Sequence, residues 1–135
     1  MIAANCFTVN ISQVPCSKKN SLVVIVDDDP HVCKGLRRLF EAAGFCALTF
    51  TSGEDLFQAL HVILPDCLVL DMHLPSVSGF EVQSQLGNRF PVIAVSGDDE
   101  PGMAQKALEL GASAFLVKPL ESDELLHTVA DLVRA

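Results

Sequence analysis

The sequence predicts an α/β fold, a doubly wound parallel sheet of five strands with helices on both faces. Short apolar runs alternate five times with segments whose apolar residues recur at helical spacing. The first run, from Leu22 to Val26, is apolar throughout, as in a strand that is covered on both faces. Such alternation is typical of parallel sheets with right-handed crossovers. The expected strands are 22–26, 45–50, 67–70, 91–95 and 114–117.

The expected helices carry recognisable start and stop signals. The first covers 30–43 with an apolar stripe, and Gly44 follows it as a C-terminal cap. The second begins at Ser52, with Asp55 at the capping-box position. We expect that helix to end between Ile63 and Pro65, and a weakly patterned third helix to lie around 80–86. The fourth helix should have Pro101 in its first turn and end before Gly111. Ser122 should cap the fifth helix.

Composition limits the partners that are expected. The chain has 135 residues, a formal net charge of −8 and a pI of about 4.7, which argue against direct nucleic-acid binding and against anionic membranes. No apolar run approaches the ~18 residues of a membrane helix. The chain start has neither the basic region nor the sustained apolar region of a secretory signal.

Residues 1–20 differ from the rest, because they have no usable period. We expect them to form a flexible N-terminal extension and residues 21–135 to form one domain. The five cysteines are scattered and odd in number, without a CxxC pair, which does not indicate a disulfide framework or a zinc site. A reducing cytoplasm is therefore the expected location.

Polar residues follow four of the expected strands. Asp27 and Asp28 follow the first, Asp71 closes the third, Ser96 the fourth and Lys118 the fifth. Parallel strands bring their carboxyl ends to one edge, where open sheets of this kind bind ligands. Two carboxylates at about 4 Å repel by roughly 4 kcal/mol near a protein surface, and Mg²⁺ bound to their oxygens would offset that repulsion.

This inventory suits phosphoryl transfer. An aspartate such as Asp71 can attack a phosphoryl group and form an acyl phosphate. Lys118 and Mg²⁺ would supply positive charge, and the Ser96 hydroxyl would supply a hydrogen-bond donor.

Four motifs follow one another along the chain: "VVIVDDDP", "LVLDMHLPSVSG", "PVIAVSG" and "GASAFLVKP". From about Ser21 to Ala135 the chain resembles the response-regulator receiver domains of two-component signalling. The resemblance implies a flavodoxin-like sheet with strand order 2-1-3-4-5. It also implies a cytoplasmic signalling domain with weak self-phosphorylating and self-dephosphorylating chemistry, and not an enzyme.

The resemblance assigns the acidic residues. Asp71 would accept phosphate from a phosphohistidine on a histidine kinase or a histidine phosphotransfer protein. Asp28 would bind Mg²⁺ directly and Asp27 through water, while Asp71 and the backbone carbonyl of His73 would complete the metal shell. Asp29 would not be a ligand; it would face water or cap the following helix.

The resemblance also assigns the switch. Lys118 would pair with the phosphate, and the Lys118–Pro119 peptide would be cis. Ser96 would move toward the phosphate and Phe115 would turn inward behind it, a two-state population shift. Gly97 would leave room for the phosphate and offer its N–H group.

Alternatives remain. In a phosphatase of the haloacid-dehalogenase type, Asp27 would be the nucleophile and Asp29 the acid/base, but His31 stands where that pattern needs Thr or Val. A receiver-like domain could also be a constitutive interaction or dimerisation module. The expected output face, for a downstream effector or a homodimer, consists of the fourth helix, fifth strand and fifth helix. The sequence leaves open whether the chain is a stand-alone receiver or a fragment.

Overall fold

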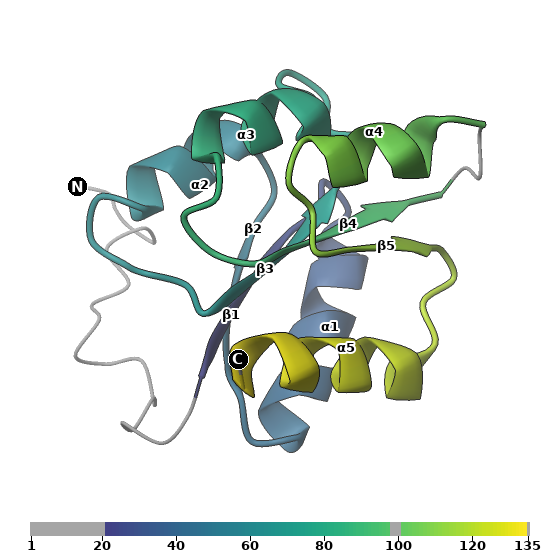
Figure 1. The fold of residues 1–135 in the computed structure, drawn as a ribbon. Coiled ribbons are helices and arrows are strands. Elements are labelled where there is room, and N and C mark those ends of the chain that lie inside the picture. The colour runs from purple at the N-terminus through teal and green to yellow at the C-terminus, as the bar shows by residue number, and fades with distance from the viewer. Residues whose placement is uncertain (1–20, 98–100, 135) are drawn as a thin grey trace.

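The computed structural model describes residues 21–97 and 101–134. Five parallel strands form one sheet in the order β2-β1-β3-β4-β5, as the resemblance implies. The helices α2, α3 and α4 cover one face, and α1 and α5 cover the other (Figure 1). The expected extension, residues 1–20, lies outside the described residues. The strands are β1 (Leu22–Val26), β2 (Cys46–Phe50), β3 (Cys67–Asp71), β4 (Val92–Ser96) and β5 (Ala114–Val117).

The helices begin where capping residues supply hydrogen bonds. Asp29 accepts from the backbone N–H of His31 at the start of α1, and Ser52 accepts from that of Asp55 at the start of α2. Gly44 follows α1 with φ +95°, as a C-terminal glycine should. The helices are α1 (Pro30–Ala42), α2 (Gly53–Ala59), α3 (Gly79–Leu86), α4 (Met103–Glu109) and α5 (Ser122–Arg134).

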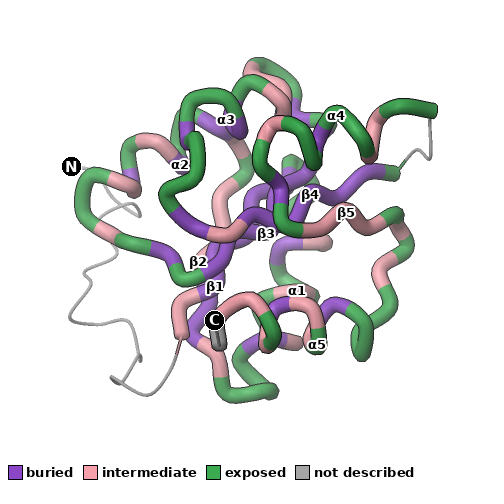
Figure 2. Tube along the Cα trace, in the orientation of Figure 1, coloured by how far each residue is buried: buried purple, intermediate pink, exposed green. Residues whose placement is uncertain are grey.

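The core has two layers, one on each side of the sheet. Val24 and Val26 of β1 pack in the layer under α2, α3 and α4, whereas Val23 and Ile25 pack in the layer under α1 and α5. The inner strands are buried along their length (Figure 2). This two-sided burial explains why the strands are continuous apolar runs and do not alternate.

Two helix boundaries differ from the sequence prediction by two residues or more. The helix α2 ends at Ala59, because the N–H groups of His61 and Val62 bond to carbonyls three residues back, which tightens the chain into a turn. The helix α4 begins at Met103 and not at Pro101, since Gly102 adopts φ +86° and stands at the N-cap.

The cysteines are not all reduced thiols. Cys33 and Cys67 are free and buried, and burial raises the pKa of Cys33 to about 11 and that of Cys67 to about 12. Cys46, in contrast, is disulfide-bonded. The scattered and odd-numbered cysteines did not indicate this bond in the sequence.

Backbone pairing continues past three strand ends. The N–H of Asp27 donates to Phe50, that of Met72 to Val95, and that of Lys118 to Ser96. The residues that follow the strands are therefore held in register at one edge of the sheet. Within the described part of the chain, no helix combines the length and the apolar character needed to cross a membrane.

Candidate functional site

Three carboxylates gather where β1 and β3 end. Asp27, Asp28 and Asp71 each offer an oxygen, and these oxygens lie within 4.8 Å of one another. Asp27 and Asp71 are buried, with 3% and 4% of their surfaces exposed, whereas Asp28 is exposed. Neighbouring parallel strands bring them together, because Val26 pairs with Leu70. A set of carboxylate oxygens with one side open to solvent suits a hard divalent cation such as Mg²⁺.

Lys118 balances part of this negative charge. Its ammonium nitrogen lies 2.8 Å from Asp27 Oδ2 and 3.4 Å from Asp71 Oδ2. The strand order places β5 two strands away from β3, and the long lysine side chain reaches back over the edge. The structure thus brings Asp27, Asp71 and Lys118 together at this edge of the sheet.

The pKa values reflect this crowding. Burial raises the pKa of Asp71, and the charge of Asp27 raises it further, against the lowering effects of the His73 N–H and of Lys118. For Lys118, burial alone would lower the pKa, but the hydrogen bond to Asp27 and the charges of both carboxylates outweigh burial and raise it. The raised pKa of Lys118 favours its charged ammonium form, whereas the raised pKa of Asp71 makes its carboxylate form less favourable than that of a solvent-exposed aspartate.

His73 touches two members of the site. Its backbone N–H donates to Asp71 Oδ1 at 3.0 Å, and its imidazole Nε2 lies 3.2 Å from Ser96 Oγ. Ser96 is fully buried at the end of β4, while His73 is exposed. The sequence prediction assigned the backbone carbonyl of His73 as a metal ligand and named no contact between the His73 side chain and Ser96. Nothing in the sequence signals it, because it depends on how the loop after β3 folds over β4.

The third aspartate of the first motif stands apart. Asp29 caps α1 through a 2.9 Å hydrogen bond from the His31 N–H, as one of the two sequence predictions proposed. Its own N–H donates to Asp27 Oδ1 at 2.9 Å, which fixes the buried carboxylate. Asp29 does not belong to the carboxylate cluster.

Gly79 is a residue whose importance sequence analysis missed. It begins α3, and its N–H donates to the Met72 carbonyl. A Cβ at this position would lie 2.5 Å from Met72 Cα and 2.7 Å from the Asp71 carbonyl oxygen. The helix start therefore packs directly on the backbone beside Asp71. The signal that could have identified it is the Ser78–Gly79 pair, a capping serine before a glycine.

The remaining predicted site residues surround the cluster. Gly97 is exposed, and a Cβ there would meet nothing within 4 Å, so space is open beside Ser96. Phe115 is half-buried on β5 and packs against the core layer under α2, α3 and α4. The Lys118–Pro119 peptide is cis, as the resemblance implies.

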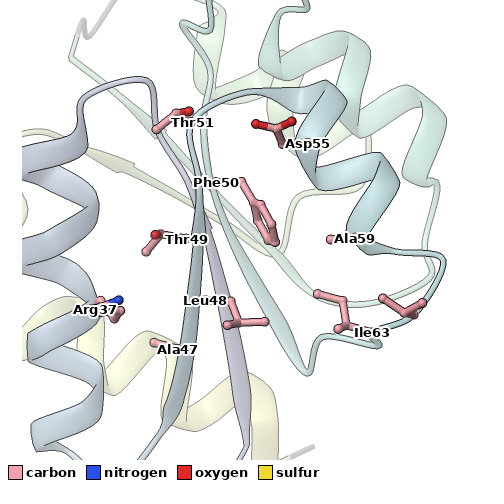
Figure 3. A pocket seen from close by; sticks show the side chains of 10 residues that line it. Arg37, Ala47, Leu48, Thr49, Phe50, Thr51, Asp55, Ala59 and Ile63 are labelled. Carbon is pink, nitrogen blue, oxygen red and sulfur yellow. The ribbon is translucent and has the colours of Figure 1, made fainter. Parts of the chain in front are cut away.

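Two hollows lie outside the carboxylate cluster. One, of about 350 Å³, runs along the outer edge of β2 between α1 and α2, with Arg37 on one side and Asp55 on the other (Figure 3). No carboxylate of the cluster lines it. The second lies between α1 and the segment after β5, and Lys118, Leu36 and Leu120 are among the residues that line it.

Comparison with known proteins identifies the family. The sequence model of the response regulator receiver domain matches residues 23–130. The response regulator protein TodT of Pseudomonas putida is 34% identical over 116 residues, which cover 84% of this chain and 51% of that protein. Nodulation protein W of Bradyrhizobium diazoefficiens is 33% identical over 112 residues, which cover 81% of this chain and 49% of that protein. The chain thus spans about half the length of these relatives.

Solved structures agree. A response regulator receiver protein from Burkholderia phymatum is 36% identical with a TM-score of 0.79, and the match covers 85% of this chain and 96% of that one. A two-component response regulator from Clostridium difficile has a TM-score of 0.81 at 21% identity, with coverage of 85% and 97%, which supports the fold alone. The family match, the relatives and the strand order lead to one conclusion: the chain belongs to the response-regulator receiver domains of two-component signal transduction.

Proposed function

We propose that this receiver domain is a phosphoacceptor switch in which Asp71 takes a phosphoryl group from a phosphohistidine with the help of Mg²⁺. The donor would be a histidine kinase or a histidine phosphotransfer protein. A carboxylate oxygen of Asp71 forms a bond to phosphorus, the phosphorus–nitrogen bond of the donor breaks, and the imidazole leaves with the electron pair and takes up a proton. The product is an acyl phosphate on Asp71.

The observation that carries this proposal is the position of Asp71. It is buried at the end of β3, next to an ammonium group and two further carboxylates. A structural aspartate gains nothing from two like charges at this distance. An acceptor gains a cation site beside the reacting oxygen.

The donor set suits Mg²⁺, which prefers carboxylate oxygens and keeps part of its water shell. Asp28 and Asp71 would hold it directly, Asp27 through water, and the His73 carbonyl would complete the protein's share. When bound, Mg²⁺ supplies positive charge that neutralises the carboxylates and the transferring phosphoryl oxygens. Lys118 would provide the second positive charge, since only 27% of its side chain is exposed and it already faces Asp71.

The phosphoryl group would then shift the domain between two states. Ser96 closes β4 and Gly97 follows it, while Phe115 lies on the neighbouring strand β5. A hydroxyl drawn from Ser96 toward the phosphate would leave space that Phe115 can fill from its half-buried position. The readout face would be α4, β5 and α5, where it would bind a downstream effector or a second copy of the domain.

The test is phosphate incorporation from acetyl phosphate with Mg²⁺, followed by intact mass. We expect one phosphate adduct on the wild type, no adduct on Asp71→Asn, and loss of the adduct when a chelator is present. Asp29→Asn is the matched control, because it removes a neighbouring carboxylate that only caps α1, and it should keep the adduct. Uptake by Asp71→Asn would contradict the assignment of the acceptor.

Two other outcomes separate the alternatives. Loss of covalent phosphate in Asp27→Asn, with retention in Asp71→Asn, would favour a phosphatase of the haloacid-dehalogenase type. No adduct on the wild type, also after rapid quenching, would favour a constitutive interaction module.

A further inference from the structure

We infer that His73 is a positioning residue that holds the Ser96 hydroxyl in the unphosphorylated state and sets how easily this hydroxyl turns to the phosphoryl group. The inference rests on the proposed function, which makes Asp71 the acceptor. The imidazole of His73 is thereby given a role separate from that of the His73 carbonyl.

One residue, His73, contacts both sides of the site: its backbone N–H bonds to Asp71 Oδ1 at 3.0 Å, and its ring lies 3.2 Å from Ser96 Oγ. The backbone contact fixes the start of the loop that carries the ring. A change at Asp71 is therefore transmitted directly to the residue that holds Ser96.

Ser96 is fully buried, and a buried hydroxyl is stable only with hydrogen-bond partners. Turning toward a phosphoryl group on Asp71 exchanges the contact with His73 for another contact. The movement is thus opposed by the hydrogen bond that it breaks, and that bond is present before any phosphate arrives. Which partner donates depends on the tautomer of the ring.

The side chain at position 73 decides whether a hydrogen bond to Ser96 can form. A leucine or alanine there could not bond to Ser96, whereas a glutamine amide could. The strength of this contact therefore depends on the side chain at position 73, which is exposed and can be changed without disturbing the core. Breaking one neutral hydrogen bond shifts an equilibrium about fivefold.

The test is a double-mutant cycle on the binding of beryllium fluoride, a phosphoryl mimic that cannot be hydrolysed, in the presence of Mg²⁺. Because the chain contains neither Trp nor Tyr, binding is followed by ¹⁹F NMR. His73→Leu should bind beryllium fluoride about fivefold more tightly than the wild type, and His73→Gln should stay near the wild type. In the Ser96→Ala background, His73→Leu should change the affinity less than twofold.

Each contrary outcome is distinct. An equal effect of His73→Leu in both backgrounds would overturn the inference, since His73 would then act through access or shielding and not through Ser96. Weaker binding by His73→Leu in the Ser96 background would also overturn it. Failure of the wild type to bind would overturn the proposed function, and the role of His73 with it.

A second measurement needs no metal. In the unphosphorylated protein, ¹⁵N NMR of the His73 ring should show a shift of the Nε2 signal on Ser96→Ala. The exposed ring of His127 on α5 is the control and should not respond. An unchanged Nε2 signal at His73 would show that the contact does not persist in solution, and would overturn the inference.

Discussion

Lys118 lies closer to Asp27 than to Asp71: its ammonium nitrogen is 2.8 Å from Asp27 Oδ2 and 3.4 Å from Asp71 Oδ2. Of the two carboxylates, Asp27 is thus the closer partner of the Lys118 ammonium group. Asp71 receives less compensation, and burial together with the charge of Asp27 raises its pKa. The proposed acceptor is held in a destabilised ionised form.

This relationship predicts that Asp71→Asn stabilises the domain near pH 7 when no divalent cation is present. A carboxyl whose pKa is raised by folding favours the folded state when protonated, and this contribution is lost as the pH rises through the folded pKa. Asp71→Asn has no carboxyl group at this position, so its stability does not fall in this way as the pH rises. Its advantage should therefore grow from acidic to neutral pH and reach on the order of 1 kcal/mol.

Urea unfolding between pH 4.5 and pH 8, with a chelator, measures this difference. Asp131→Asn on α5 is the control, because it removes one exposed carboxylate of the same charge and should change the free energy of unfolding by less than about 0.5 kcal/mol. An Asp71→Asn variant that is less stable than the wild type at pH 8 would refute the prediction.

Gly79→Ala should destabilise the fold and disturb the site together. The new methyl group would lie 2.5 Å from Met72 Cα and 2.7 Å from the Asp71 carbonyl oxygen, and backbone atoms cannot turn away as a side chain can. We expect a loss of about 1–3 kcal/mol in the free energy of unfolding. We also expect slower phosphorylation at Asp71, measured by intact mass.

Gly35→Ala is the matched control for this glycine. Gly35 lies inside α1, and a Cβ there would meet nothing within 4 Å. It should stabilise the domain by about 0.5–1 kcal/mol, because alanine loses less backbone freedom in a helix. Equal effects of the two substitutions would mean that close packing on Asp71 does not matter.

Gln83 ties α3 to α4 from inside the core. Its Nε2 donates to the Ala107 carbonyl at 3.0 Å, while its buried Oε1 has no hydrogen-bond partner among the described residues. Gln83→Met removes one bond and one unsatisfied acceptor, which offset each other. The global free energy of unfolding should change by less than about 1 kcal/mol, but α4 should open more often.

Hydrogen exchange at the amides of α4 measures that opening. We expect faster exchange in Gln83→Met and no change in Gln85→Met, which alters an exposed glutamine of the same helix. Unchanged protection of α4 in Gln83→Met would show that other packing holds the two helices together. Lys106, 4.4 Å from the centre of the Phe80 ring, is the first candidate for that role.

The proposed output face predicts a phenotype without loss of phosphorylation. Leu108 on α4 is 50% exposed and Val117 on β5 is 38% exposed, so apolar surface is available there for a partner. Leu108→Glu should abolish phosphorylation-dependent self-association, measured by sedimentation velocity after treatment with acetyl phosphate. The adduct on Asp71 should form as in the wild type.

Leu64→Glu is the control, because Leu64 is 76% exposed but lies between α2 and β3, away from that face. It should keep the association. If the wild type stays monomeric when phosphorylated, self-association is not the output, and an effector is the remaining expectation for this face.

The carboxyl edge of the sheet could be predicted from sequence because parallel topology needs no side-chain detail. Once the strands are known, Asp27, Asp71, Ser96 and Lys118 must meet, and the structure places them at one edge. Helix boundaries were harder. The start of α4 depends on the conformation of Gly102, which competes with a proline signal one residue earlier.

Contacts between loops and helices could not be predicted in this way. The bond between His73 and Ser96 depends on the path of a loop, and the burial of Gln83 depends on where α4 settles. From the sequence alone, Gln83 is a polar residue on a weakly patterned helix, and nothing indicates that α4 buries it. The disulfide of Cys46 was missed because spacing carries no information on distance between elements.

The pairing of Asp27 with Lys118 joins residues that are 91 positions apart. During synthesis, the first acidic residues emerge long before the lysine and before β5, so the early chain holds the carboxylates without their cation. The pairing cannot form until the chain has been synthesised past β5, since Lys118 directly follows that strand. A copy of the chain that ends before Lys118 would therefore hold Asp27 and Asp71 without the cation that balances them.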